Sequence, residues 1–320
     1  MFKSFAMAAT AAVLGVGLAA SAGAATGRID ITVPSGPGGG WDQTGRAVQQ
    51  SLRAARISSN VQVLNVPGAG GTIGLAQFKT TRKGNPNAML VGGFTLISSV
   101  ITNKSAVSLS DVTPIARLTA EYEIIVVPSA SPLRTLGDLV ARLKANPGAV
   151  SWAGGSAGST DHVLAALVAD AVGVGGAKVN YVPHAGGGEA MTSILGGHVS
   201  VGVGGWNEYE AQIKDGKLRA LGIAAPQRVP GINVPTFREQ GVNVELANWR
   251  GLFAPPGLNQ KQISALGEAV AKMARSPEWK KYRQERGWLD YYQPKAEFDQ
   301  FIVQQQATMK KTLGSLGMTR

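Results

Sequence analysis

Residues 33–46 read V-P-S-G-P-G-G-G-W-D-Q-T-G-R, a glycine-rich turn between a short apolar strand expected over residues 29–33 and a helix with an apolar face beginning at Ala47. The first N–H groups of a helix have no partner inside it, and the helix dipole is positive at that end. The stretch therefore predicts a binding site for an anion. Phosphate is disfavoured, because the Walker pattern requires Gly-Lys-Ser/Thr and here Gly40 is followed by Trp41.

A second glycine-rich turn between a strand and a helix lies in the middle of the chain. Residues 152–162 read W-A-G-G-S-A-G-S-T-D-H and connect a strand expected over residues 149–153 to a helix expected over residues 161–172. A further cluster, N-V-P-G-A-G-G-T-I-G at 65–74, misses the G-x-G-x-x-G spacing of dinucleotide sites, and no strand ending in an acidic residue follows it, so it indicates another backbone-lined loop. Two anion turns in two α/β units predict two lobes that hold one ligand between them.

Strands and helices alternate along most of the chain, which is typical of α/β proteins with a parallel sheet in each lobe. Strands are expected at 29–33, 61–66, 88–92, 113–118, 123–127, 149–153, 178–182, 199–203, 218–223 and 244–253, and later helices at 72–79, 134–145, 161–172, 189–195, 260–274, 277–286 and 296–316. About 295 residues remain after a leader is removed, which suggests two domains by size. Ligands of such sheets bind beyond the carboxyl ends of the strands.

The first 25 residues have the features of a secretory signal peptide. Lys3 gives a minimal positive start, residues 5–20 are apolar and rich in alanine, and small residues at 20–24 fit cleavage sites. The apolar run is shorter than the ~20 residues that a membrane span needs. The chain has no cysteine, so it offers neither a lipid-attachment residue nor disulfides. We expect an exported protein of the periplasm that is not lipid-anchored.

The formal net charge is +11 and the isoelectric point is about 9.9. The basic residues are scattered and form no run longer than a pair, so they indicate a solvated basic surface rather than a nucleic-acid partner. The three histidines form no metal-ligand pair and cysteine is absent, so the sequence predicts neither a metal site nor a cofactor.

One pattern favours an enzyme. Residues 154–158 read G-G-S-A-G and match the G-x-S-x-G nucleophile elbow between a strand and a helix, with His184 or His198 as a possible base. The oxyanion motif H-G-G-G is absent upstream, and the similar turn before Asp42 suggests that exposed backbone, not Ser156, is the shared element. A secreted serine hydrolase stays open as the alternative function.

Other polar and aromatic residues near the turns have two interpretations. Asp42 and Arg46 are four residues apart at a helix start, which favours an ion pair over ligand contact. Trp41 and Trp206 each follow a glycine cluster at a strand end, where they either line the cleft or pack in the core.

Several ordered motifs carry a resemblance to one family. They are P-x-x-P-G-G-G-x-D, N-x-P-G-A-G-G-x-x-G, G-G-S-x-G-S-x-D-H, V-P-H-A-G-G-G-E-A, G-K-L-R-A-L-G-I, N-V-P-T-F-R-E-Q-G and W-R-G-L-F-A-P-P-G, spread over residues 28–320. The chain resembles the periplasmic substrate-binding proteins of tripartite tricarboxylate transporters, the TctC or Bug family. The G-G-G-W-D and H-A-G-G-G-E segments look most like its tricarboxylate-binding branch.

The resemblance implies a two-lobed Venus-flytrap fold, with crossover segments near residues 121–127 and 247–253. Residues 26–123 with 250–320 would form one lobe and residues 124–249 the other. It also implies a carboxylate ligand, citrate above all, held by backbone amides and waters rather than by arginines, and a monomer that delivers it to membrane subunits. The ligand-binding residues expected from it are Ser35, Gly36, Pro37, Gly38, Gly39, Gly40, Trp41, Asp42, Gly93, Thr95, Gly155, Ser156, Ala157, Gly158, Ser159, Thr160, Asp161, His184, Gly186, Gly187, Trp206 and Asn207.

Overall fold

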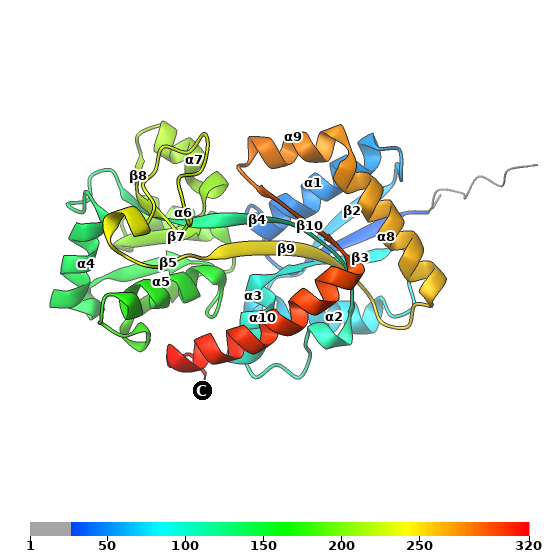
Figure 1. Cartoon of the computed structure of the whole chain (residues 1–320), viewed down its shortest axis with the longest axis horizontal. Coiled ribbons are helices and arrows are strands. Elements are labelled where there is room, and N and C mark those ends of the chain that lie inside the picture. The colour runs from blue at the N-terminus through cyan, green and yellow to red at the C-terminus, as the bar shows by residue number, and fades with distance from the viewer. Residues whose placement is uncertain (1–26, 320) are drawn as a thin grey trace, which may run out of the picture.

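A ten-stranded mixed sheet runs through both lobes of the computed structural model, which describes residues 27–319 (Figure 1). Its strand order is β2-β1-β3-β9-β4-β7-β5-β6, and β8 and β10 also pair with β4. The leader predicted over residues 1–25 lies outside the described residues.

The first lobe combines the start and the end of the chain. Its elements are β1 (Ile29–Val33), α1 (Gly40–Ala54), β2 (Val61–Asn65), α2 (Thr72–Thr81), β3 (Ala88–Gly93), α3 (Phe94–Thr102), α8 (Gln260–Arg275), α9 (Pro277–Glu285), β10 (Leu289–Pro294) and α10 (Lys295–Ser315). Every residue of β1 is buried, because this strand lies between β2 and β3 and is covered on both faces.

The second lobe holds the middle of the chain. Its elements are α4 (Leu136–Ala145), β5 (Ser151–Gly154), α5 (Thr160–Ala171), β6 (Asn180–Pro183), α6 (Gly187–Leu195), β7 (Val201–Gly205), α7 (Trp206–Lys214) and β8 (Leu218–Ile223). Short 3-10 turns lie at Ala69–Gly71, Leu109–Asp111, Pro147–Ala149, Gly176–Lys178 and Arg238–Gln240. Strands β6 and β7 both run parallel to β5.

Two long strands, β4 (Thr113–Pro128) and β9 (Ala247–Ala254), join the lobes (Figure 1). Residues 113–122 of β4 pair with β9, whereas residues 123–126 pair with β7, so β4 passes from one lobe to the other near Tyr122. Both strands run antiparallel to their neighbours, whereas the other pairings within each lobe, β1 with β2 and β3 and β5 with β6 and β7, are parallel as expected, so the sheet as a whole is mixed.

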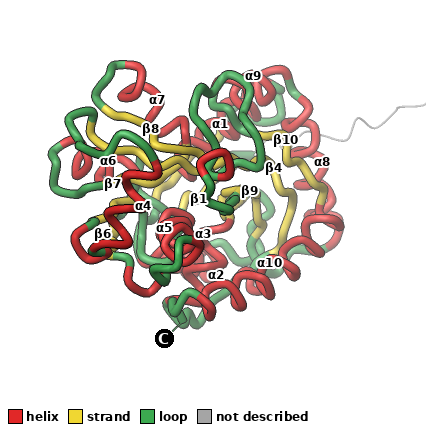
Figure 2. Tube along the Cα trace, turned by 60° about the vertical axis from the view of Figure 1, so that its left-hand side comes forward, coloured by secondary structure: helices red, strands yellow, loops and turns green. Residues whose placement is uncertain are grey.

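The apolar interior follows this division. One buried cluster fills the first lobe around Ile31, Leu52 and Phe253, and two more lie in the second lobe, around Trp152 and around Ile194. The first cluster also reaches α5 of the second lobe, which lies beside α3 (Figure 2). The lobes are therefore in contact beside the pocket described below.

Three parts of the secondary structure differ from the expectation. Helices α3 and α7 begin directly at the ends of β3 and β7, where the sequence analysis had placed no helix. The C-terminal region, expected to be helical, contains β10, which pairs with β4. Residues 113–118 and 123–127, expected as separate strands, are one continuous strand.

Candidate functional site

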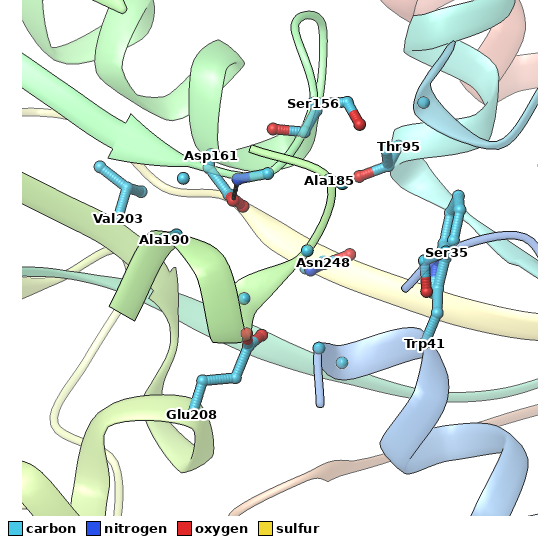
Figure 3. Close-up of a pocket in the computed structure, with 18 of the residues that line it drawn as sticks. Ser35, Trp41, Thr95, Ser156, Asp161, Ala185, Ala190, Val203, Glu208 and Asn248 are labelled. Carbon is cyan, nitrogen blue, oxygen red and sulfur yellow. Dashed lines mark hydrogen bonds between the residues drawn. The ribbon is translucent and has the colours of Figure 1, made fainter. Parts of the chain in front are cut away.

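The first turns of five helices meet at one pocket between the lobes. Helices α1, α3, α5, α6 and α7 each follow a strand of the sheet, and each contributes a first-turn residue to the lining (Figure 3). The pocket volume is about 90 Å³, and since ~10–15 Å³ holds one water molecule, a small metabolite fits. Because helix N-termini present unpaired N–H groups and positive dipole ends, this arrangement attracts anions.

One acidic side chain, Asp42, stabilises the conformation of the first glycine-rich turn. Asp42 Oδ2 accepts hydrogen bonds from the Gly38 N–H at 3.1 Å and from Arg46 Nε at 2.9 Å, and its other oxygen accepts one from Asn65 at 3.0 Å. Burial opposes ionisation of Asp42, but these hydrogen bonds outweigh it and hold its pKa below the ordinary value. Asp42 is thus an ionised support of the turn, in the ion pair that its spacing to Arg46 favoured.

The second turn is held by α5 in the same manner. Asp161 Oδ2 accepts the Gly155 N–H at 2.5 Å, and His162 Nδ1 accepts the Gly158 N–H at 3.1 Å. The His162 ring stacks on Tyr181 with centroids 4.2 Å apart. Burial lowers the pKa of His162 to about 4, so the neutral ring serves as the acceptor for this turn at neutral pH.

The third turn, which precedes α6, is held by the same kind of hydrogen bond between a carboxylate and a backbone N–H. Glu189 Oε2 accepts the Ala185 N–H at 3.0 Å. In all three turns, a carboxylate in the first turn of the helix binds a backbone N–H of the loop that precedes it, which is a favourable place for a negative charge.

The crossover strands supply charged side chains beside the pocket. Arg250 of β9 lines it, is 1% exposed and pairs with the equally buried Glu121 of β4. Two residues away, Asn248 Nδ2 donates to Glu123 Oε1 at 2.6 Å. Burial raises the pKa of Glu123 well above its ordinary value, and the neighbouring carboxylates add to this shift. The crossover strands thus place two glutamates, Glu121 and Glu123, and one positively charged side chain, Arg250, beside the pocket.

Two further carboxyl groups face the pocket from the second lobe (Figure 3). Burial raises the pKa of Asp161 to about 6, although the hydrogen bond from Gly155 opposes the shift. Burial raises the pKa of Glu208 to about 8, and the charges of Glu121 and Asp161 act in the same direction. Asp161 is therefore mostly ionised at neutral pH, whereas Glu208 is mostly protonated.

Hydrogen bonds join the two lobes at the edge of the pocket. Thr95 and Thr160 share one at 2.9 Å between their hydroxyls. The Ser98 hydroxyl donates to the Gly158 carbonyl, and Asn207 donates to Gln43. The lobes are thus closed against each other in this structure.

About half of the predicted ligand-binding residues line this pocket. They are Ser35, Gly39, Gly40, Trp41, Thr95, Gly155, Ser156, Ser159, Asp161, Gly186 and Gly187. Both glycine-rich turns that the sequence singled out therefore contribute to the same pocket, one from each lobe.

The other predicted residues lie outside the lining, in three roles. Seven residues support the turns or the contact between lobes, and Gly93 packs beside them against β9. The seven are Gly36, Pro37, Gly38, Asp42, Gly158, Thr160 and Asn207. Ala157 and His184 line a neighbouring hollow that shares Ser156 with the pocket. Trp206 lines a different hollow, with Ile213 and Leu218.

Several lining residues were not predicted from the sequence, above all Glu208, Asn248 and Arg250. A signal for Arg250 exists, since a charged residue inside an apolar strand must be paired or lie at a site. Glu208 follows a glycine pair as Asp42 does, but without an expected helix its position in a first turn could not be recognised. Gly68 and Gly70, in the backbone-lined loop, also contribute to the lining.

The nucleophile elbow has no geometric support. An elbow serine lies on a strained turn, yet the non-glycine residues with positive φ among residues 27–319 are Arg56, Ala69 and Lys104. No hydrogen bond joins the Ser156 hydroxyl to a histidine within this part of the chain. Across the described residues there is also no group of three or more potential metal ligands, and no helix is long and apolar enough to cross a membrane.

Two lobes joined by crossover strands, with an anion-attracting pocket between them, define the class of periplasmic solute-binding proteins. The chain belongs to the tripartite tricarboxylate transporter family receptors (TctC), whose family model matches residues 45–318. It is 30% identical over 257 residues to Protein BugT of Bordetella pertussis, a match that covers 78% of this chain and 76% of BugT.

Solved structures agree in fold. Periplasmic binding protein BugD matches with a TM-score of 0.83 at 22% identity, over 91% of this chain and 98% of BugD. MatC (Rpa3494) from Rhodopseudomonas palustris, solved with bound malate, matches with a TM-score of 0.80 at 22% identity, over 89% of this chain and 98% of MatC. The resemblance seen in the sequence motifs and the two-lobed α/β fold are thereby confirmed.

Proposed function

We propose that this protein is exported to the periplasm, captures a small organic di- or tricarboxylate between its lobes as a monomer, and delivers it to the membrane subunits of a tripartite tricarboxylate transporter. The lobes would comprise residues 26–123 with 250–320, and residues 124–249. Membership of the TctC family supports this function. The malate bound by MatC makes C4 dicarboxylates candidates beside citrate.

The observation that carries the proposal is the convergence of five helix N-termini on one pocket. Charge-assisted hydrogen bonds from backbone N–H groups bind carboxylates strongly, and exclusion of water between closed lobes strengthens them. Turns from opposite lobes suit a ligand that carries a carboxylate at each end.

The test is calorimetric titration of the protein without its leader against malate, adipate and citrate. Uncharged malamide is the control, because it keeps the size of malate and removes both charges. We expect one acid per monomer, no binding of malamide, and no turnover. At a hundredfold excess over the dissociation constant, the bound acid should add ~2.7 kcal/mol to the free energy of unfolding. Equal affinity for malate and malamide, or ester hydrolysis that Ser156→Ala abolishes, would refute the proposal.

A further inference from the structure

Glu208 differs from the other acidic residues in the first turns of these helices. Asp42, Asp161 and Glu189 each accept a backbone N–H from the loop before their own helix. Helix α7 begins at Trp206, immediately after β7, so no loop separates it from the strand, and Glu208 accepts a hydrogen bond from the backbone of Gly205, the last residue of β7. Its carboxyl group lines the pocket, as that of Asp161 does (Figure 3).

The surroundings of Glu208 are acidic. Strand β4 places Glu121 and Glu123 near it, and α5 places Asp161 there. Helix α6 contributes only backbone, since Gly187 lies so close that a Cβ on it would overlap Glu208 Oε2. Within α7, the next residue is the buried Tyr209.

The nearby cation is shared with another carboxylate. Arg250 of β9 is paired with Glu121, and both side chains are buried. An ionised Glu208 would therefore add a negative charge beside Glu121 and Asp161 that Arg250 compensates only in part, which is costly for a half-buried carboxyl group. Burial, reinforced by the charges of Glu121 and Asp161, raises the pKa of Glu208 to about 8, although Arg250 and the hydrogen bond from Gly205 oppose the shift.

We infer that Glu208 binds the ligand as a neutral carboxylic acid, donating its proton in a hydrogen bond to a ligand carboxylate. This inference rests on the proposed function. It explains how an anion can bind beside an acidic residue, because the O–H group is a donor and O–H···O⁻ hydrogen bonds are strong. It makes Glu208 a specificity-determining residue: an ammonium group at this position would require the ionised form.

The consequence is a dependence of affinity on pH. With a pKa of about 8, Glu208 is ~90% protonated at about pH 7 and ~10% protonated at about pH 9. Binding to the protonated form alone should therefore weaken about tenfold across this range. Near pH 9, binding should also take up close to one proton from the buffer.

Calorimetry with malate tests this, with adipate in its place if malate does not bind. Both acids stay fully ionised from about pH 7 upward, so the ligand itself does not titrate. Glu208→Gln keeps a neutral donor and should bind at pH 7 within about threefold of the wild type, with no weakening at pH 9. Glu210→Gln is the matched control on the same helix, because Glu210 pairs with Lys214 instead, and it should follow the wild type.

The opposite results would show an ionised Glu208. Those results are loss of binding in folded Glu208→Gln, affinity in the wild type that does not change with pH, or binding of aspartate that strengthens toward pH 9. Thermal unfolding checks that each variant is folded, and if Glu208→Gln is not, proton uptake by the wild type decides the question. Absence of binding of malate, adipate and citrate to the wild type at pH 7 overturns the proposed function itself, and this inference with it.

Discussion

The buried pair between Arg250 and Glu121 is a residue-scale feature that the family resemblance did not include. That resemblance implied a ligand held by backbone amides rather than arginines, yet Arg250 lines the pocket. Its guanidinium lies so close to α1 that a Cβ on Gly40 would overlap it. Glycine at position 40 thus lets the start of α1 approach the charged pair on the crossover strands.

Breaking this pair should be costly. Arg250→Met leaves Glu121 buried and unpaired, and we expect a loss of ~3–5 kcal/mol in the free energy of unfolding. The matched change at an exposed pair, Lys214→Met beside Glu210, should cost less than ~1 kcal/mol. Urea unfolding measures both. A loss below ~1 kcal/mol for Arg250→Met would mean that the pair contributes no more than a surface ion pair.

At the scale of elements, the sequence predicted those whose pattern is local. Residues 136, 139 and 143 face inward on α4, and a capping box of Thr135 and Asp138 starts that helix. In contrast, α3 reads F-T-L-I-S-S-V-I-T, and its polar residues are small Ser and Thr side chains that are partly or fully buried against the other lobe. The helix therefore lacks the charged, exposed face by which a surface helix is recognised.

The other two missed elements depend on distant parts of the chain. Helix α7 begins directly after β7, with no turn before it and no side-chain cap, so its start carries no local sequence signal. Strand β10 is L-D-Y-Y-Q-P between two helices, and its partner β4 is some 170 residues away, so no local pattern reveals the pairing. The candidate site was predictable to a similar extent: the turns were found from their glycines, but the side chains brought by β9 and α7 required the tertiary structure.

His162, in the first turn of α5, should make the stability of the fold depend on pH. His162 has a pKa of about 4 in the fold against 6.5 when unperturbed, because burial disfavours its charged form. The unfolded chain therefore binds more protons between these values, and the stability contributed by neutral His162 is lost as the pH falls from about 6.5 to about 4. Protonation also removes the acceptor for the Gly158 N–H.

His162→Gln keeps an acceptor that does not titrate. We expect it to be less stable than the wild type at pH 7, since the stacking on Tyr181 is lost, and this difference should shrink or reverse toward about pH 4.5. Melting temperatures across this range measure it, with the exposed His198→Gln as control. The raised pKa of Asp161 acts in the opposite direction in both proteins, so only the difference between them is informative. A difference that stays constant with pH would contradict the role of His162.

At the scale of the whole molecule, function requires the closed arrangement to be reversible. The lobes meet through few polar contacts at the pocket edge, and a ligand that bridges both turns would add to them. Gly39 lies at this boundary, where a Cβ would be 3.3 Å from the Gly187 backbone nitrogen of the other lobe. Its own conformation is extended, with φ −81° and ψ 173°, so a side chain there is compatible with the fold but not with full closure.

Gly39→Val should therefore hold the lobes apart without unfolding the protein. Overpacking of ~1–3 kcal/mol corresponds to malate affinity about 5- to 150-fold weaker, and the variant should stay expanded in small-angle scattering at a malate concentration that shrinks the radius of gyration of the wild type. Gly267→Ala, on α8 where a Cβ meets nothing within 4 Å, is the control and should close like the wild type. If scattering curves of the wild type superimpose with and without bound malate, ligand binding does not move the lobes. If Gly39→Val binds malate with unchanged affinity, close contact between Gly39 and Gly187 is not needed for binding.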